Sequence, residues 1–143
     1  MGKPNRLGAQ HGRECLKLLE HFIGPTQRAV IAQALKGEES QFFIDKLLWL
    51  AALVESAPLP YGTHGKGNEA KVLLHYFAGG TASAWIIEKD SSTVQHQAFG
   101  LTTMGDEPEL GYISIVEWLA NGAELDLYFT PCTLRELKEA KDF

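Results

Sequence analysis

Cysteine is scarce in this sequence, and its scarcity excludes some kinds of stabilisation. Cys15 and Cys132 are the only cysteines among 143 residues, and they form no CxxC pair. A structural zinc site of the cysteine type therefore lacks its ligands. Because Cys15 falls in an apolar helical stripe and Cys132 in a turn, we expect two free thiols rather than a disulfide.

Long hydrophobic runs are also missing. The longest, LLWLAALV at 47–54, has eight residues, whereas a membrane-spanning helix needs about 20. The N-terminal residues contain no apolar segment typical of a secretory signal, and Arg6 stands where an acylation signal requires Ser or Thr. We therefore expect a cytoplasmic protein without a membrane partner.

Cations are absent from one long stretch near the C-terminus. Between Asp106 and Thr130 there is no lysine or arginine, although six carboxylates occur there. Residues 104–143 carry nine acidic and three basic side chains, and the formal net charge of the whole chain is −5. Such a segment repels nucleic acid and attracts a basic protein surface. The charge pattern thus argues against direct nucleic-acid binding and favours a basic protein as partner.

The first part of the chain, residues 9–56, has the apolar periodicity of helices. Gly24-Pro25 separates the first helix from the second, and Thr26 is the candidate N-cap of the second. The longest expected helix, 38–56, is apolar on almost every side. A helix of that kind is buried on several sides or meets a partner, so a homodimer through 38–56 is one hypothesis.

The rest of the chain reads as a loop followed by strands. Residues 57–70 contain two prolines and three glycines without apolar periodicity, and they divide the helical part from the strand-rich part, 71–143. A short helix capped by Ser114 precedes the last strand, and Thr133 caps a C-terminal helix. We therefore predict an α+β fold in a single domain, 1–143, with N-terminal helices packed on a mostly antiparallel sheet. The five expected strands are 71–77, 83–90, 95–102, 109–115 and 123–129.

Strand alternation suggests an acidic surface. In the segment 123–129, Glu124, Asp126 and Tyr128 alternate with apolar residues and so share one face. If this strand neighbours strand 109–115, the carboxylates of both gather on one surface with several aromatic rings. The predicted interaction residues are Asp106, Glu107, Glu109, Tyr112, Glu117, Trp118, Glu124, Asp126 and Tyr128.

Three interpretations of this surface compete. It is a solvated face that keeps the protein soluble, or an acidic docking surface with aromatic anchors. The third is a carboxylate cluster that binds Mg²⁺ or Ca²⁺ or performs acid–base chemistry. The carboxylates are scattered over several elements rather than spaced within one loop, which argues against a calcium site.

A metal site is a separate alternative. His75, Glu88 and His96 lie on consecutive expected strands, and two histidines with one carboxylate form a known facial set of metal ligands. A partly buried histidine that is hydrogen-bonded to a neighbour explains the same residues, and no spacing motif supports a metal. GxSxG and HExxH motifs are both missing, so the sequence names no catalytic residue and implies no cofactor.

Two segments in the second half resemble a known family. These are EPELGY at 107–112 and DLYFTPCTL at 126–134, within a similarity that covers about residues 27 to 137. The chain resembles small proteins, classed as a domain of unknown function, that are encoded on bacterial plasmids, integrative elements and phages. The resemblance implies a mobile-DNA context, often near genes that counter host restriction or CRISPR defence. It transfers no enzymatic activity and no catalytic residues.

This genetic context favours the interpretation of the acidic surface as a docking surface. Inhibitors of host nucleases often place carboxylates where the nucleic-acid phosphates would bind. The leading hypothesis is therefore a non-enzymatic protein-binding protein, an anti-CRISPR or anti-restriction inhibitor that blocks a basic groove of a host protein such as a CRISPR effector or restriction complex. The alternatives are a small metal-dependent enzyme or binding domain using His75, Glu88 and His96, and a structural homodimeric accessory protein.

Overall fold

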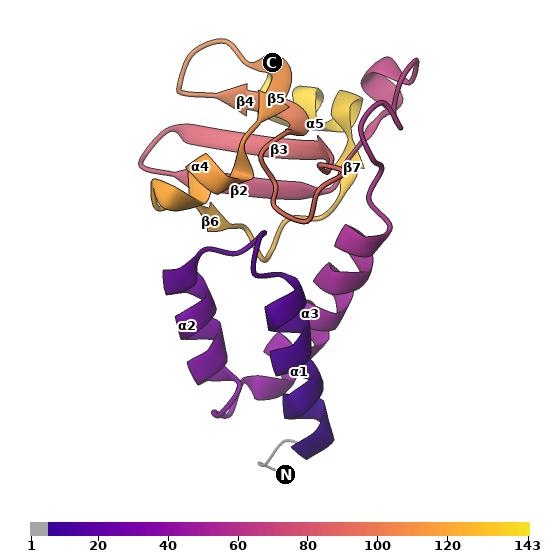
Figure 1. Ribbon diagram of the computed structural model, residues 1–143. Coiled ribbons are helices and arrows are strands. Elements are labelled where there is room, and N and C mark those ends of the chain that lie inside the picture. The colour runs from indigo at the N-terminus through magenta and orange to yellow at the C-terminus, as the bar shows by residue number, and fades with distance from the viewer. Residues whose placement is uncertain (1–5) are drawn as a thin grey trace. The chain divides into compact units, whose positions relative to one another are not determined.

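The computed structural model describes residues 6–143 and confirms the predicted α+β class (Figure 1). The chain forms two compact units with the division after Ser56, where the helical part meets the expected loop. Within residues 6–143 no helix is long and apolar enough to cross a membrane. Residues 1–5, which enter the expectations about secretory and acylation signals, lie outside the described residues.

The first unit consists of three helices. They are α1 (Arg6–Leu18), α2 (Pro25–Ala34) and α3 (Ser40–Glu55). The expected N-cap of α2 is wrong by two residues, since Gly24 caps the helix and Pro25 begins it. Proline suits the first helical position because its missing N–H has no partner there in any case and its φ is already helical.

Helices α1 and α3 pack against each other within this unit. A Cβ at Gly12 of α1 would lie 3.1 Å from a methyl group of Leu35 and 3.3 Å from Ile44, so a larger residue there would require these side chains to shift slightly. On α3, Leu47 is only 1% exposed, whereas Trp49 is 41% exposed. This helix is therefore buried along one stripe rather than all round.

The second unit is built on an antiparallel five-stranded sheet. Its strands lie in the order β5-β4-β3-β2-β6 (Figure 1). A separate antiparallel pair joins β1 to β7. The strands are β1 (Lys71–Val72), β2 (Leu74–Ala78), β3 (Ala82–Glu88), β4 (Ala98–Thr103), β5 (Glu109–Ile113), β6 (Glu124–Leu125) and β7 (Cys132–Thr133). A short 3₁₀ helix, η1 (Gly67–Glu69), interrupts the loop that precedes them.

All five expected strands differ in their bounds from the observed strands, and two of them are divided or cut short. Segment 71–77 divides at Leu73 into β1 and β2, which belong to different sheets. Segment 123–129 is a strand only at Glu124–Leu125, because Asp126 then turns the chain away. Its Oδ1 accepts a hydrogen bond from the main-chain N–H of Tyr128 at 2.9 Å, which is an Asx turn. The alternating pattern of 123–129 therefore does not describe a continuous strand.

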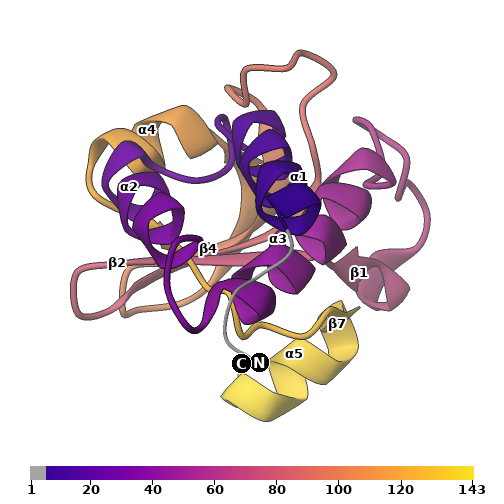
Figure 2. The ribbon, with the colours of Figure 1, turned by 90° about the horizontal axis from the view of Figure 1, so that it is seen from below.

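Both expected helix caps in this unit are confirmed. Ser114 Oγ accepts from the N–H of Glu117 at the start of α4 (Ile115–Ala120). Thr133 and Glu136 form a reciprocal capping box at the start of α5 (Leu134–Lys141). Figure 2 shows α5 beside β7 and β1, and the N–H of Leu134 donates to the carbonyl of Ala70 at 2.9 Å.

One face of the sheet carries the core on which the candidate site is built. Trp85 pairs with Leu101 across β3 and β4, so both side chains project from this face. They belong to one buried cluster with Leu134 and Leu137 of α5. By the same register, Leu110 pairs with Leu101 and extends this face to the edge strand β5.

Candidate functional site

A bulge in β3 directs a carboxylate into the core face. Ile86 pairs with Gly100, but the next paired residue is Glu88, which lies opposite Phe99. In a regular strand Ile87 and Glu88 would point to opposite faces, whereas here both line the same cavity. The close approach requires Gly100, since a Cβ there would lie 1.9 Å from the carbonyl oxygen of Trp85.

Glu88 fastens the loop 57–70 to the sheet. Its side chain is almost wholly buried, with the residue 6% exposed. Oε1 accepts from the main-chain N–H of Tyr61 at 3.0 Å, and Oε2 accepts from the N–H of Thr63 at 3.0 Å. The Thr63 hydroxyl also donates to Oε2. A carboxylate that receives three donors from one loop restrains the conformation of that loop.

The loop presents an exposed tyrosine in a strained backbone conformation. Tyr61 has φ of 69°, in the left-handed region that side chains other than glycine rarely adopt, and it is 74% exposed. Its hydroxyl lies 3.4 Å from the hydroxyl of Tyr112, which is on β5 and is 61% exposed. The Tyr112 ring in turn meets Phe99 edge-on, with centroids 6.0 Å apart and planes at 77°.

The electrostatic surroundings raise the pKa of the Tyr112 phenol. The hydrogen bond with Tyr61 is the largest cause, followed by the charge interaction between the two tyrosines. The negative charge of Glu88 contributes in the same direction, because it opposes a second negative charge on the ring oxygen. The negative charge of the buried carboxylate therefore acts on the Tyr112 hydroxyl.

These residues enclose a cavity of about 390 Å³, here called the tyrosine cavity. Its lining includes the apolar residues Ile87, Leu110 and Leu134 and the two hydroxyl-bearing residues Tyr61 and Tyr112. This size and composition are typical of sites that receive a side chain or a small molecule, which occupy about 300–1,000 Å³.

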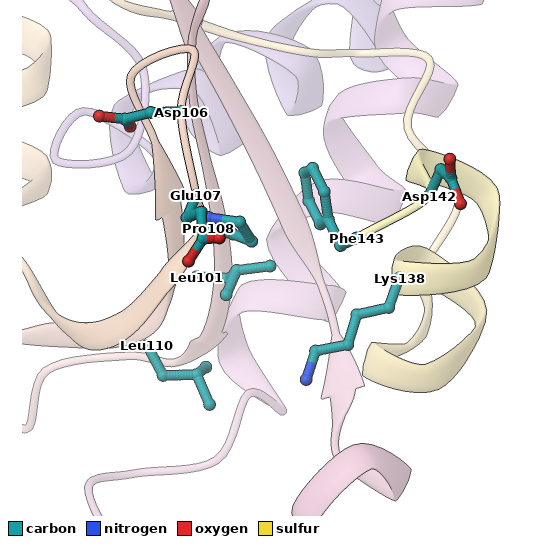
Figure 3. A pocket seen from close by; sticks show the side chains of 8 residues that line it. All are labelled: Leu101, Asp106, Glu107, Pro108, Leu110, Lys138, Asp142 and Phe143. Carbon is teal, nitrogen blue, oxygen red and sulfur yellow. The ribbon is translucent and has the colours of Figure 1, made fainter.

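A second, more open cavity of about 730 Å³ adjoins it at Leu110, which lines both. We call this one the charged cavity. Figure 3 shows residues of β4, β5 and the loop between them on one side, and Lys138, Asp142 and Phe143 on the other. The strand-side residues are Leu101, Asp106, Glu107, Pro108 and Leu110. The two cavities together, with β5 as their outer wall, are called the β5 groove below.

The predicted interaction residues do not form one surface. Strands β5 and β6 lie at opposite edges of the sheet, with three strands between them, so the adjacency on which the single acidic face depended is wrong. Asp106, Glu107, Glu109 and Tyr112 lie in β5 or directly before it. Glu124, Asp126 and Tyr128 lie in β6 or directly after it, and Glu117 and Trp118 lie on α4.

Among the described residues, the acidic group at β5 is not held in ion pairs, although Lys138 lines the same charged cavity. Asp106, Glu107 and Glu109 are all exposed, and within residues 6–143 none of them takes part in an ion pair. Leu110 beside them is 50% exposed. Acidic and apolar side chains therefore occur together along this edge.

The three candidate metal ligands do not meet, which corrects the expectation of a facial site. His75 Nδ1 lies 2.9 Å from Asp126 Oδ2, Glu88 is occupied by the loop, and the main-chain N–H of His96 donates to Asp90. Across the described part of the chain, no group of three or more histidine, cysteine or acidic side chains could hold a metal ion.

His75 instead forms a polar relay. Its Nε2 lies 3.1 Å from Ser83 Oγ, and its ring stacks on Trp85 with centroids 5.1 Å apart and planes at 12°. The order Asp126, His75, Ser83 is that of an activated serine nucleophile. Ser83 lies inside β3 and pairs with Phe77 on one side and a β4 residue on the other, and the relay also fastens the turn after β6 to the sheet.

Sequence reasoning missed Tyr61, Thr63 and Phe99, and it placed Glu88 in the wrong role. The loop 57–70 was correctly predicted as a loop, but neither its composition nor its spacing indicates that its main chain binds a carboxylate 25 residues away. Comparisons with protein-family models, curated proteins and solved structures found no match to this chain.

Proposed function

We propose that this protein acts by binding another protein, and that a positively charged segment of the partner docks along the β5 groove. The observation that carries this proposal is the coincidence, at one sheet edge, of exposed apolar and acidic side chains. Tyr61, Leu110 and Tyr112 are 74%, 50% and 61% exposed, and the carboxylates of Asp106, Glu107 and Glu109 near them take part in no ion pair within residues 6–143.

The edge strand adds main-chain hydrogen-bonding capacity. Strand β5 ends the five-stranded sheet, so its outer side has no strand partner among the described residues. An extended peptide that adds to such an edge gains affinity from main-chain hydrogen bonds and specificity from side-chain pockets. The tyrosine cavity and the charged cavity supply two such pockets on one face of β5.

In this proposal the charged and the apolar residues contribute to binding in different ways. Exposed carboxylates at the rim of an interface accelerate association and select basic partners more than they add affinity. The desolvated aromatic and aliphatic centre supplies most of the binding energy. The acidic residues at β5 would therefore steer the partner, and Leu110 and the two tyrosines would hold it.

The family resemblance suggests the class of partner. A protein that is encoded on a mobile element and places acidic residues against a basic surface has the properties expected of an inhibitor of host defence. We therefore propose a host protein with a basic nucleic-acid groove, in a CRISPR effector or restriction complex, as the partner in the cytoplasm.

Charge reversal tests the proposal. The variant Glu107→Lys/Glu109→Lys alters the β5 edge, and Glu117→Lys/Glu124→Lys makes the same charge change on α4 and β6. Each purified protein is used to capture partners from bacterial lysate at low and at high salt, and captured proteins are quantified by mass spectrometry.

We expect the β5 variant to lose at least about tenfold of the specific capture, with the α4/β6 variant unchanged, and capture to weaken as salt screens the charges. Equal capture by both variants would contradict docking at β5. Loss in the α4/β6 variant alone would place the interface at the other edge.

Exposed apolar residues on α3 favour one alternative, a homodimeric accessory protein. Phe42, Leu48 and Trp49 are 42%, 44% and 41% exposed, and Lys46 lies 4.7 Å from the Trp49 ring. Sedimentation equilibrium at micromolar concentration distinguishes the two, since Trp49→Glu would dissociate a dimer formed through this helix.

A further inference from the structure

We propose that the tyrosine cavity binds an arginine side chain of the partner segment, and this inference rests on the proposed docking along β5. Three aromatic rings, from Tyr61, Phe99 and Tyr112, line the cavity. Aromatic faces attract cations through their quadrupole, and a planar guanidinium can also stack on them.

The cavity is electronegative at its buried end. Both carboxylate oxygens of Glu88 accept hydrogen bonds, and the donors are all neutral groups of Tyr61 and Thr63. None of the ion pairs within residues 6–143 involves Glu88. Its negative charge is therefore hydrogen-bonded but not neutralised, and it acts on any group that enters the cavity.

Hydrogen-bond acceptors favour arginine over lysine. The hydroxyls of Tyr61 and Tyr112 lie 3.4 Å apart, and at most one of the two donates to the other, so acceptor positions remain on both oxygens. A guanidinium offers five donors in one plane, which suits two neighbouring acceptors, whereas lysine presents a compact and strongly hydrated charge. Asn68, which also lines the cavity, already accepts from Lys138 at 3.0 Å, so the tyrosine end is the one left for an incoming cation.

The cavity is organised before any ligand arrives. Holding a non-glycine residue at φ of 69° costs free energy, and the hydrogen bonds of Glu88 maintain Tyr61 there. Because the loop adopts this conformation when the protein folds, a ligand loses no binding free energy in ordering it. A preformed binding cavity would explain why the main chain of a mostly exposed tyrosine is hydrogen-bonded to a buried carboxylate.

Nuclear magnetic resonance titration of the ¹⁵N-labelled full chain tests the inference with small probes. N-acetyl-L-arginine amide is compared with N-acetyl-L-citrulline amide, its uncharged isostere, at matched ionic strength. We expect saturable shifts in the signals of Tyr61, Thr63, Phe99 and Tyr112, with citrulline at least tenfold weaker.

Two tyrosine variants locate the binding site. Tyr112→Ala should weaken the arginine probe at least tenfold, and Tyr61→Ala provides a second variant if the first disturbs β5. Tyr128→Ala is the matched control, because Tyr128 is a 79% exposed tyrosine beyond the opposite sheet edge. It should leave probe binding unchanged.

Equal binding of the citrulline and arginine probes would overturn the assignment. Shifts from the arginine probe that are confined to Asp106–Glu109 would do the same, and so would phenol binding more tightly than the arginine probe. The two proposals fail separately. Saturable arginine binding with partner capture unaffected by charge reversal would keep the cavity and remove docking along β5. Charge-sensitive capture without saturable arginine binding would do the reverse.

Discussion

Oε1 of Glu88 accepts a hydrogen bond from the main-chain N–H of Tyr61 at 3.0 Å, although the two residues are 27 positions apart. The contact joins a β-bulge to an exposed loop, and both carry residues of the tyrosine cavity. The position of the Tyr61 ring therefore depends on a carboxylate that the partner would scarcely touch, since Glu88 is 6% exposed.

Replacing this carboxylate should release the loop. In Glu88→Gln the side-chain amide would present a donor to one of the two main-chain N–H groups, leaving a part-buried donor unsatisfied at a cost of up to about 1–3 kcal/mol. We expect that loss in urea unfolding, together with faster motion of Tyr61 in relaxation measurements. The exposed Glu117→Gln serves as control and should change stability by no more than about 0.5 kcal/mol. An unchanged stability of Glu88→Gln would show that the loop does not depend on this contact.

The bulge itself can be tested at Gly100. A Cβ in Gly100→Ala would lie 1.9 Å from the carbonyl oxygen of Trp85, so the strands must separate. We expect a loss of about 1–3 kcal/mol or more in the free energy of unfolding, and loss of arginine binding because Glu88 is displaced. Gly111 pairs with Gly100 and has open space around its Cβ position, so Gly111→Ala should change stability by less than about 1 kcal/mol. Similar effects of the two substitutions would contradict this account of the bulge.

Acid should destabilise the second unit partly through Asp90. Main-chain N–H groups, first that of Ser92 and then those of Gln97 and His96, hold the pKa of this carboxyl below its ordinary value of 3.8. A pKa that is lowered by folding stabilises the native state above the unfolded value, and that contribution is lost as the pH falls through the folded value. Stability from Asp90 is therefore complete above about pH 3.8 and declines below it.

The variant Asp90→Asn removes this titration. We expect it to be less stable than the parent at about pH 6, and to lose less further stability between about pH 4 and about pH 2. Chemical unfolding measured at several pH values checks this, with Asp106→Asn as the matched control for the loss of one aspartate charge. Parallel pH profiles for the parent and Asp90→Asn would refute the assignment.

The relay of Asp126, His75 and Ser83 should behave as a structural clamp. Asp126→Ala removes the partner of a half-buried imidazole and the acceptor of the Tyr128 N–H, so a loss of about 1–3 kcal/mol is expected. Ser83→Ala removes one side-chain hydrogen bond, for which a loss of about 0.5–1.5 kcal/mol is typical. Treatment with a fluorophosphonate ester tests the alternative, in which Ser83 is a nucleophile. Labelling that disappears in Ser83→Ala would reveal a nucleophile and add acyl transfer to the functions of this protein.

Local signals in the sequence were reliable where a few neighbouring residues decide the structure. Ser114 and Thr133 cap their helices as expected, since a cap depends on a side chain reaching an N–H three residues away. The α+β class followed from the change of apolar period after the loop 57–70. The full strand at 123–129 was wrong because the Asx turn at Asp126 overrides the alternation after two residues.

The amino-acid sequence by itself determined the class of elements, the positions of two helix caps and the accumulation of acidic residues around and after strand β5. Only the tertiary structure decided that β5 and β6 lie at opposite edges, which divides that acid into two groups. It also decided that the hydroxyls of Tyr61 and Tyr112, 51 residues apart, lie next to each other, and that the buried carboxylate of Glu88 lines the same cavity. The physical reason is range: caps and turns depend on residues three or four positions apart, whereas strand order and the bulge depend on contacts between distant segments that periodicity does not encode.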